Sequence, residues 1–296
     1  MQVVLQLLIT GFSLGSFYAL IAMGFSIIFG VTHAFNLAHG EMVLLSGYLA
    51  YVLCKATDFP FLATLPICMM ALLAAATLLH SLLRKLREPF EMNSLLVTFG
   101  LALVLQNLML LFFSADYRLI PLEPAGIFTL PFLHLTITKP QVLLIGLSLA
   151  ATGAMHVVLR KTFLGKALRA TIQDREGAAL AGIDVQAMNR IGFGFGGLLI
   201  GLAGPIFGQF TYLHPAGGME ATITAVVITI FAGVGRTRSI LAGGWLLGMA
   251  ESVAIFALGA NWREAVSALL LLGLLMWKPQ GILSHAPKRS WNSPSQ

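Results

Sequence analysis

The sequence predicts an all-α membrane protein, a polytopic bundle of about eight or nine transmembrane helices with broken helices and an inverted repeat. Hydrophobic residues make up 57% of the 296 residues and charged residues only 10%, whereas soluble domains carry about 25% charged residues. Long uncharged stretches recur along the chain, and several reach the roughly 20 residues that a spanning helix needs. These stretches are continuously apolar and lack the alternation of a transmembrane β-strand.

In chain order, the apolar stretches predict nine crossings, at about residues 3–29, 40–54, 61–83, 92–113, 140–160, 190–212, 221–235, 239–258 and 262–277. The shorter segments are candidates for half-helices that enter the membrane without crossing it. Between the fourth and fifth crossings, the stretch 116–139 contains Pro121, Pro124, Gly126 and Pro131. These residues predict an outer loop. Whether a short part of this loop re-enters the membrane is left open.

The basic residues set the expected orientation. Fourteen of the 18 lysines and arginines fall in the segments 84–91, 160–190, 236–238 and the C-terminal tail, and four fall on the other side. Because cytoplasmic loops are enriched in lysine and arginine, the N-terminus is expected outside and the C-terminus in the cytoplasm. The basic residues lie at the ends of spans, beside anionic lipid, so the net charge of +6 does not indicate nucleic-acid binding.

A single transmembrane domain is expected over residues 1–296, with a first half at about 1–160, a cytoplasmic loop at 160–190, a second half at 190–283 and a polar tail at 284–296. A faint repeat relates the halves. Gly11–Ser16 resembles Gly192–Gly197, and Ala22 then aligns with Ala203. Five crossings separate the copies, so they run in opposite directions, as in an inverted repeat. A chance match between glycine-rich segments is the alternative.

A charged island at Arg160–Arg190 holds nine of the 30 charged residues (18 basic and 12 acidic). Lys166–Thr171 and Arg175–Ala181 are expected to form short helices, and Gly182 to cap the second. Alanine-rich helices of this kind fit a groove on a partner. A basic loop on the lipid surface is the alternative, which the acidic residues and the small apolar patch of the island disfavour.

Polar residues interrupt the first two apolar stretches at Asn36, His39 and Glu41. A carboxylate at membrane depth costs about 2.5 kcal/mol or more unless it is paired or wet, and non-helical backbone there must be buried in protein or line a cavity. A helix break beside a polar pathway is one interpretation. A plain loop at the inner face, with Glu41 at the start of the next helix, is the other. The chain has no HExxH pattern, so a metal site is not expected.

A second interruption contains Pro215, Gly217 and Glu220, in the corresponding place of the second half. Paired interruptions indicate a transport site, whereas an ordinary outer turn is the alternative. Glu251 lies between two further apolar stretches, where a carboxylate is a functional candidate. It is alternatively a structural partner of an arginine, Arg118 or Arg263.

The chain resembles a known family in three segments, YALIAMGFSIIFGVTHAFNLAHGEMVLLSGYLA, GKALRATIQDREGAALAGID and GGMEATITAVVITIFAGVGRTRSILAGGWLLGMAES. They look like the branched-chain amino acid permeases of bacterial ABC importers, and most like the LivH-type subunit. The resemblance implies a multi-pass permease of the inner membrane, not an enzyme. It also implies three kinds of partner besides membrane lipid: a second, LivM-like permease, two cytoplasmic ATPases that bind ATP and Mg²⁺, and a periplasmic substrate-binding protein.

The resemblance further implies that the island docks on an ATPase, through Arg169, Asp174, Ala178, Ala179 and Gly182. The chain contains no GxxxxGK[ST] and therefore no P-loop of its own. No cofactor is expected on this chain. A urea or short-chain amide permease of the same type, an ion-coupled secondary transporter and a channel-like pore are the alternatives. A membrane enzyme would need a clustered nucleophile, base or metal set, and the sequence shows none.

Overall fold

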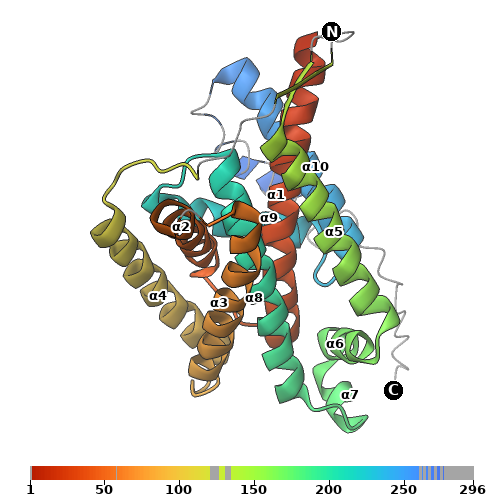
Figure 1. Cartoon of the computed structure of the whole chain (residues 1–296). Coiled ribbons are helices and arrows are strands. Elements are labelled where there is room, and N and C mark those ends of the chain that lie inside the picture. The colour runs from red at the N-terminus through yellow and green to blue at the C-terminus, as the bar shows by residue number, and fades with distance from the viewer. Residues whose placement is uncertain are drawn as a thin grey trace.

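The computed structural model describes residues 2–57, 59–120, 127–130 and 135–259, together with isolated positions between 262 and 276. The described chain is a helical bundle (Figure 1). Its helices are α1 (Gln2–Thr32), α2 (His39–Thr57), α3 (Phe61–Leu83), α4 (Phe90–Phe113), α5 (Lys139–Lys161), α6 (Phe163–Gln173), α7 (Arg175–Leu180), α8 (Val185–Phe210), the 3-10 turn η1 (Pro215–Gly217), α9 (Gly218–Ala232) and α10 (Thr237–Leu258).

Eight helices lie where the sequence predicts the first eight crossings, namely α1 to α5 and α8 to α10. The ninth predicted crossing, 262–277, and the polar tail lie largely or wholly outside the described residues. Seven described segments are long and apolar enough to cross a membrane. The helix α2 is not one of them, because His39, Glu41 and Lys55 lower its mean hydropathy. The polytopic all-α prediction is confirmed.

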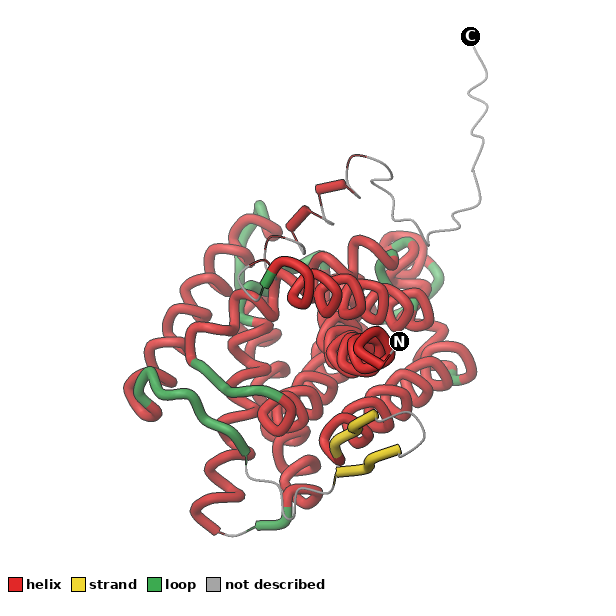
Figure 2. Tube along the Cα trace, turned by 90° about the horizontal axis from the view of Figure 1, so that it is seen from above, coloured by secondary structure: helices red, strands yellow, loops and turns green. Residues whose placement is uncertain are grey.

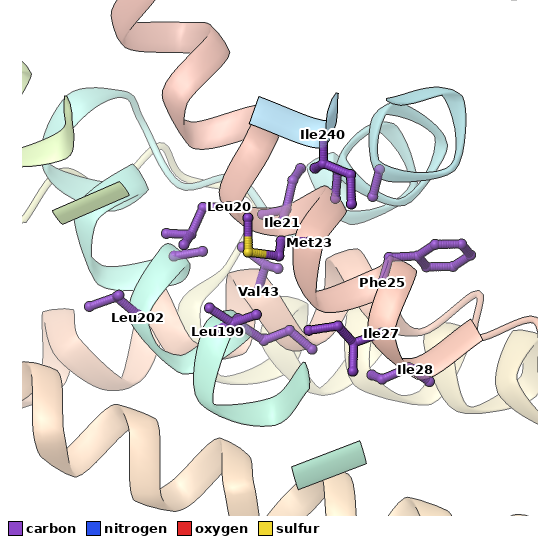
Figure 3. Close-up of a cluster of buried hydrophobic side chains, with 14 of the residues drawn as sticks. Leu20, Ile21, Met23, Phe25, Ile27, Ile28, Val43, Leu199, Leu202 and Ile240 are labelled. Carbon is purple, nitrogen blue, oxygen red and sulfur yellow. The ribbon is translucent and has the colours of Figure 1, made fainter. Parts of the chain in front are cut away.

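The first helix is the centre of the bundle. Its most apolar window is 94% buried, and Figure 2 shows α1 end-on with other helices around it. Leu20, Ile21 and Met23 of α1 pack against Val43 of α2 and Leu199 of α8 in the buried cluster of Figure 3. Since lipid is as apolar as these side chains, close packing rather than escape from water holds such helices together.

Glycines allow α1 and α8 to approach their neighbours closely. Added Cβ atoms at Gly11 and Gly15 of α1 would meet the backbone of α10, at Met249 and Gly244. Added Cβ atoms in α8 would meet the backbone of α3 in the same way. Small residues at this four-residue spacing permit backbone contact between membrane helices.

Contacts between helices support the inverted repeat. Helix α1 packs most extensively on α10, and its counterpart α8 packs most extensively on α3, the counterpart of α10. Likewise α1 contacts α9 as α8 contacts α2. Phe17 stacks on Phe207, whereas Val31 lies against Gly192, so α1 and α8 run in opposite directions.

The register of the repeat differs from the sequence alignment. The alignment pairs Gly11 with Gly192, but the glycines of α8 that approach the backbone of α3, as Gly11 and Gly15 approach that of α10, are Gly197 and Gly201. Glycine-rich sequence matches itself in several registers. The choice between them comes from helix packing, which the alignment does not contain.

The loop after α4 contains a β-hairpin. Strands β1 (Ile127–Leu130) and β2 (Leu135–Thr138) pair antiparallel, and the side chain of Gln6 exchanges two hydrogen bonds with the backbone of Thr136, at 2.9 and 3.2 Å. The hairpin therefore lies at the N-terminal end of α1, where Figure 2 shows it at the edge of the bundle. The turn residues Pro121, Pro124, Gly126 and Pro131 lie outside the described residues.

Candidate functional site

The two interruptions of the apolar pattern meet in the fold. The backbone N–H of Gly40, in the first turn of α2, donates to the hydroxyl of Thr222 in α9 at 2.8 Å. That hydroxyl lies 3.2 Å from the carbonyl oxygen of Leu37, in the first break. A Cβ atom at Gly40 would overlap the carbonyl oxygen of Gly218, the first residue of α9. Two helix N-termini from opposite halves of the chain are thus in direct backbone contact.

This junction lies beside the middle of α1. The Nε2 atom of His39 is 3.0 Å from the carbonyl oxygen of Ile21, and α1 continues for eleven more residues to Thr32, a rise of about 16 Å. The chain 33–38 therefore turns back into the bundle before α2 begins. This geometry favours a helix break inside the bundle over a plain loop at the end of the helix, and Glu41 lies in the first turn of α2.

Three polar atoms at the junction have no hydrogen-bond partner among the described residues. They are Asn36 Nδ2, His39 Nδ1 and Glu41 Oε2, and all three residues are at most 3% exposed. Buried polar atoms are nearly always satisfied, by protein, water or ligand. The carboxyl of Glu41 lies against Gly218, at the N-terminus of α9, where the helix dipole favours negative charge.

Gly217, Glu220 and Glu251 line a cavity of about 220 Å³ on the other side of the α9 N-terminus. The hydroxyl of Tyr18 donates to Glu251 at 2.5 Å, and Glu251 is 1% exposed. Phe17, stacked on Phe207 with ring centroids 4.2 Å apart, forms part of the apolar wall. Carboxyl groups beside aromatic faces suit a cationic group attached to an apolar one.

The predicted pathway residues therefore fall into two adjacent groups. Asn36, His39 and Glu41 lie at the junction of α2 and α9, and Gly217, Glu220 and Glu251 line the cavity. Pro215 is buried at the start of η1, which leads into α9.

The structure describes one of the two arginines expected as partners of Glu251, namely Arg118. Arg118 pairs with Asp116 at 3.1 Å, and Arg263 lies outside the described residues. Sequence reasoning missed Tyr18 and Thr222, the hydrogen-bonding residues of the cavity and the junction. Their signal was a hydroxyl group within a long uncharged stretch.

The charged island folds as the two short helices that the sequence predicts, α6 and α7. The side chain of Asp174 caps α7 by accepting from the N–H of Gly177 at 2.9 Å. Gly182 has φ +82°, the left-handed conformation of a C-terminal cap. Arg169 Nε donates to the carbonyl oxygen of Leu159 at the end of α5, at 2.9 Å. Ala178 is buried.

Four of the five residues assigned to partner docking thus hold the island in shape. The exposed apolar side chains are different ones, Phe163 at 86% and Leu180 at 90% exposure. Figure 1 shows α6 and α7 at the end of the bundle opposite the N-terminus. With its amide oriented to satisfy both groups, Asn189 accepts from Arg175 of α7 at 3.1 Å and donates to the carbonyl of Val31 at 3.0 Å. The island is therefore hydrogen-bonded to the last turn of α1.

Among the described residues, no group of three or more histidine, cysteine, aspartate or glutamate side chains is arranged to hold a metal ion. The cysteines Cys54 and Cys68 are free thiols.

Comparison with known proteins identifies the family of this bundle. The profile of the family described as branched-chain amino acid transport system / permease component matches residues 7–275. The high-affinity branched-chain amino acid transport system permease protein BraD of Pseudomonas aeruginosa is 28% identical over 95% of this chain and 96% of its own length. The corresponding LivH protein of Escherichia coli is 27% identical over the same shares. The autoinducer 2 import system permease protein LsrC of Yersinia enterocolitica is 30% identical over 42% of this chain and 37% of its own. No solved structure matches the chain significantly.

Proposed function

This chain belongs to the family of branched-chain amino acid transport system permease components, and we propose that it carries branched-chain or other hydrophobic amino acids across the bacterial inner membrane as one subunit of an ABC importer. The observation that carries the proposal is the junction of α2 and α9. Two helix N-termini meet beside the middle of α1, next to buried polar atoms that have no hydrogen-bond partner among the described residues. Transporters place their substrate sites at such discontinuous helices.

The substrate path runs along the six pathway residues and Pro215. A hydrophobic amino acid presents an ammonium group, a carboxylate and an apolar side chain. In the cavity, Glu220 and Glu251 attract the ammonium group while Phe17 and Phe207 contact the side chain. The carboxyl of Glu41 already faces the N-terminus of α9. The substrate carboxylate therefore binds N–H donors other than those at the start of α9.

The helices α6 and α7 couple ATP hydrolysis in the partner subunits to transport. We place the N-terminus outside and the island in the cytoplasm, as the bias of basic residues indicates. Phe163 and Leu180 insert into a groove of an ATPase subunit, which supplies the bound ATP and Mg²⁺. A second permease, a second ATPase and a periplasmic binding protein complete the importer. Arg169, Asp174, Ala178 and Gly182 act by keeping the docking helices rigid, whereas the exposed Ala179 is left for contact with the ATPase.

Reconstitution in proteoliposomes with the candidate ATPases and binding protein tests the proposal. We expect leucine uptake that requires ATP on the side of the membrane where the ATPases are bound. Excess isoleucine should inhibit this uptake. Urea or acetamide uptake in place of leucine uptake would reassign the substrate. Uptake without nucleotide would instead support a pore, and uptake that collapses with the ion gradient would support a secondary transporter.

Docking is tested separately with Leu180→Asp. We expect substrate-stimulated ATP hydrolysis to fall at least tenfold, because a leucine contributes about 1.5–3 kcal/mol when it is buried and the aspartate adds a desolvation cost. Gln186→Asp is the matched control, since it places the same charge on an exposed side chain at the same end of the bundle. Equal loss in both variants would show a general charge effect and contradict the docking assignment.

A further inference from the structure

A strongly basic cavity lies at the island end of the bundle. It encloses about 380 Å³ between the last turns of α5, the helix α6 and the start of α10. Four arginines line it, Arg160, Arg169, Arg236 and Arg238, and the described residues that line it include no aspartate or glutamate. It is separate from the junction of α2 and α9 and from the cavity beside Glu251.

The arginines come from three segments that the fold brings together. Arg160 is in the last turn of α5, Arg169 is on α6, and Arg236 and Arg238 flank the first residue of α10. Arg160 and Arg238 are exposed, and neither makes an ion pair with any other described residue. The like charges of Arg160 and Arg238 at one cavity repel each other, so an anion that enters it lowers this cost.

The walls of the cavity are built and held in place. Nδ1 of His156 is 2.9 Å from the hydroxyl of Thr237 and joins α5 to the first residue of α10. The Nε atom of Arg169 donates to the carbonyl oxygen of Leu159. This bond holds the Arg169 side chain in the wall of the cavity. The cavity also adjoins the N-terminus of the 22-residue helix α10, where backbone N–H groups and the helix dipole favour an anion.

We propose that this cavity binds a phosphate group. Guanidinium groups bind phosphate oxygens in pairs of parallel hydrogen bonds, and several arginines around one cavity fit a group that carries several such oxygens. An anionic phospholipid headgroup is the nearest source. Val157, one turn before Arg160, is 49% exposed on an apolar helix, and basic pockets at the ends of spanning helices take anionic headgroups.

The bound phosphate links three segments of the chain. It bridges α5, the docking helix α6 and the turn from α9 to α10, and Gly235 of that turn donates its N–H to the hydroxyl of Ser26 in α1 at 2.9 Å. Occupancy therefore stabilises one arrangement of the island relative to the central helix.

The test measures binding to the full chain without transport, so its outcome is independent of the substrate assignment. Delipidated protein is titrated with short-chain phosphatidylglycerol, short-chain phosphatidylcholine and inorganic phosphate, with native mass spectrometry and the unfolding midpoint as readouts. We expect saturable binding of phosphatidylglycerol and none of phosphatidylcholine. Arg160→Gln/Arg238→Gln should weaken binding about 30-fold, from about fivefold per arginine near an anionic group.

The control is Arg87→Gln, which removes the same charge at an exposed position outside the cavity. It should bind phosphatidylglycerol as the unmodified chain does. Competition by millimolar inorganic phosphate would identify a free phosphate compound as the ligand, and its absence would identify the lipid. Equal binding of the two lipids, or a double variant that elutes and unfolds normally and binds as the unmodified chain does, would overturn the proposal.

Discussion

The substitution Gly40→Ala tests whether the contact between α2 and α9 is needed for transport. The new methyl group would overlap the carbonyl oxygen of Gly218 and approach the backbone nitrogen of Thr222 to 2.8 Å. Both are backbone atoms, so neither moves away by a change of rotamer. The two helix N-termini must separate.

The magnitude follows from what the separation removes. Overpacking a closely packed site costs about 1–3 kcal/mol. The N–H of Gly40 also loses the hydroxyl of Thr222 as its acceptor, and a buried donor without a partner costs about 1–3 kcal/mol. Against this, alanine gains up to about 1 kcal/mol over glycine within a helix. We expect a net destabilisation of about 1–5 kcal/mol from these terms.

The assay compares unfolding midpoints in detergent and leucine uptake in proteoliposomes. Gly100→Ala is the matched control, because Gly100 lies within α4 and its added Cβ would meet no atom within 4 Å. The control should unfold at or slightly above the midpoint of the unmodified chain, with unchanged uptake. A Gly40→Ala variant with the same midpoint and uptake as Gly100→Ala would refute the reasoning, since it would show that the junction is loosely packed.

Three other substitutions probe the same region. Thr222→Val keeps the shape of the side chain but removes the acceptor for Gly40, so we expect a loss of about 1–3 kcal/mol in unfolding free energy and lower uptake; an unchanged midpoint would contradict the bond. Tyr18→Phe removes the donor to Glu251 and should raise the KM for leucine at least fivefold at constant protein level. A purely structural role of Tyr18 would instead lower the unfolding midpoint and leave the KM unchanged. Glu251→Gln keeps the hydrogen-bonding shape and removes the charge, so uptake should fall at least tenfold if the carboxyl attracts the ammonium group; normal uptake would remove Glu251 from the path.

Helix positions and the charged island could be predicted because their signals are local. Uncharged stretches of spanning length locate α1, α3, α4, α5 and α8 within about five residues. The caps of the island are equally local, since Asp174 binds the N–H three residues later and Gly182 takes a conformation that favours glycine. The role of Arg169 could not be predicted in this way, because its acceptor is the end of another helix.

The sequence by itself determined that the chain spans a membrane repeatedly, that one charged segment interrupts it, and that Asn36–Glu41 and Pro215–Glu220 break the apolar pattern. Composition and spacing decide these features, because the bilayer demands apolar spans and satisfied backbone. Only the tertiary structure decided that the two breaks meet at Gly40 and Thr222 and that Tyr18 bonds to Glu251. These pairs are separated by 182 and 233 residues, so their proximity follows from how α1 and α8 pack against α10 and α3, which no local pattern encodes.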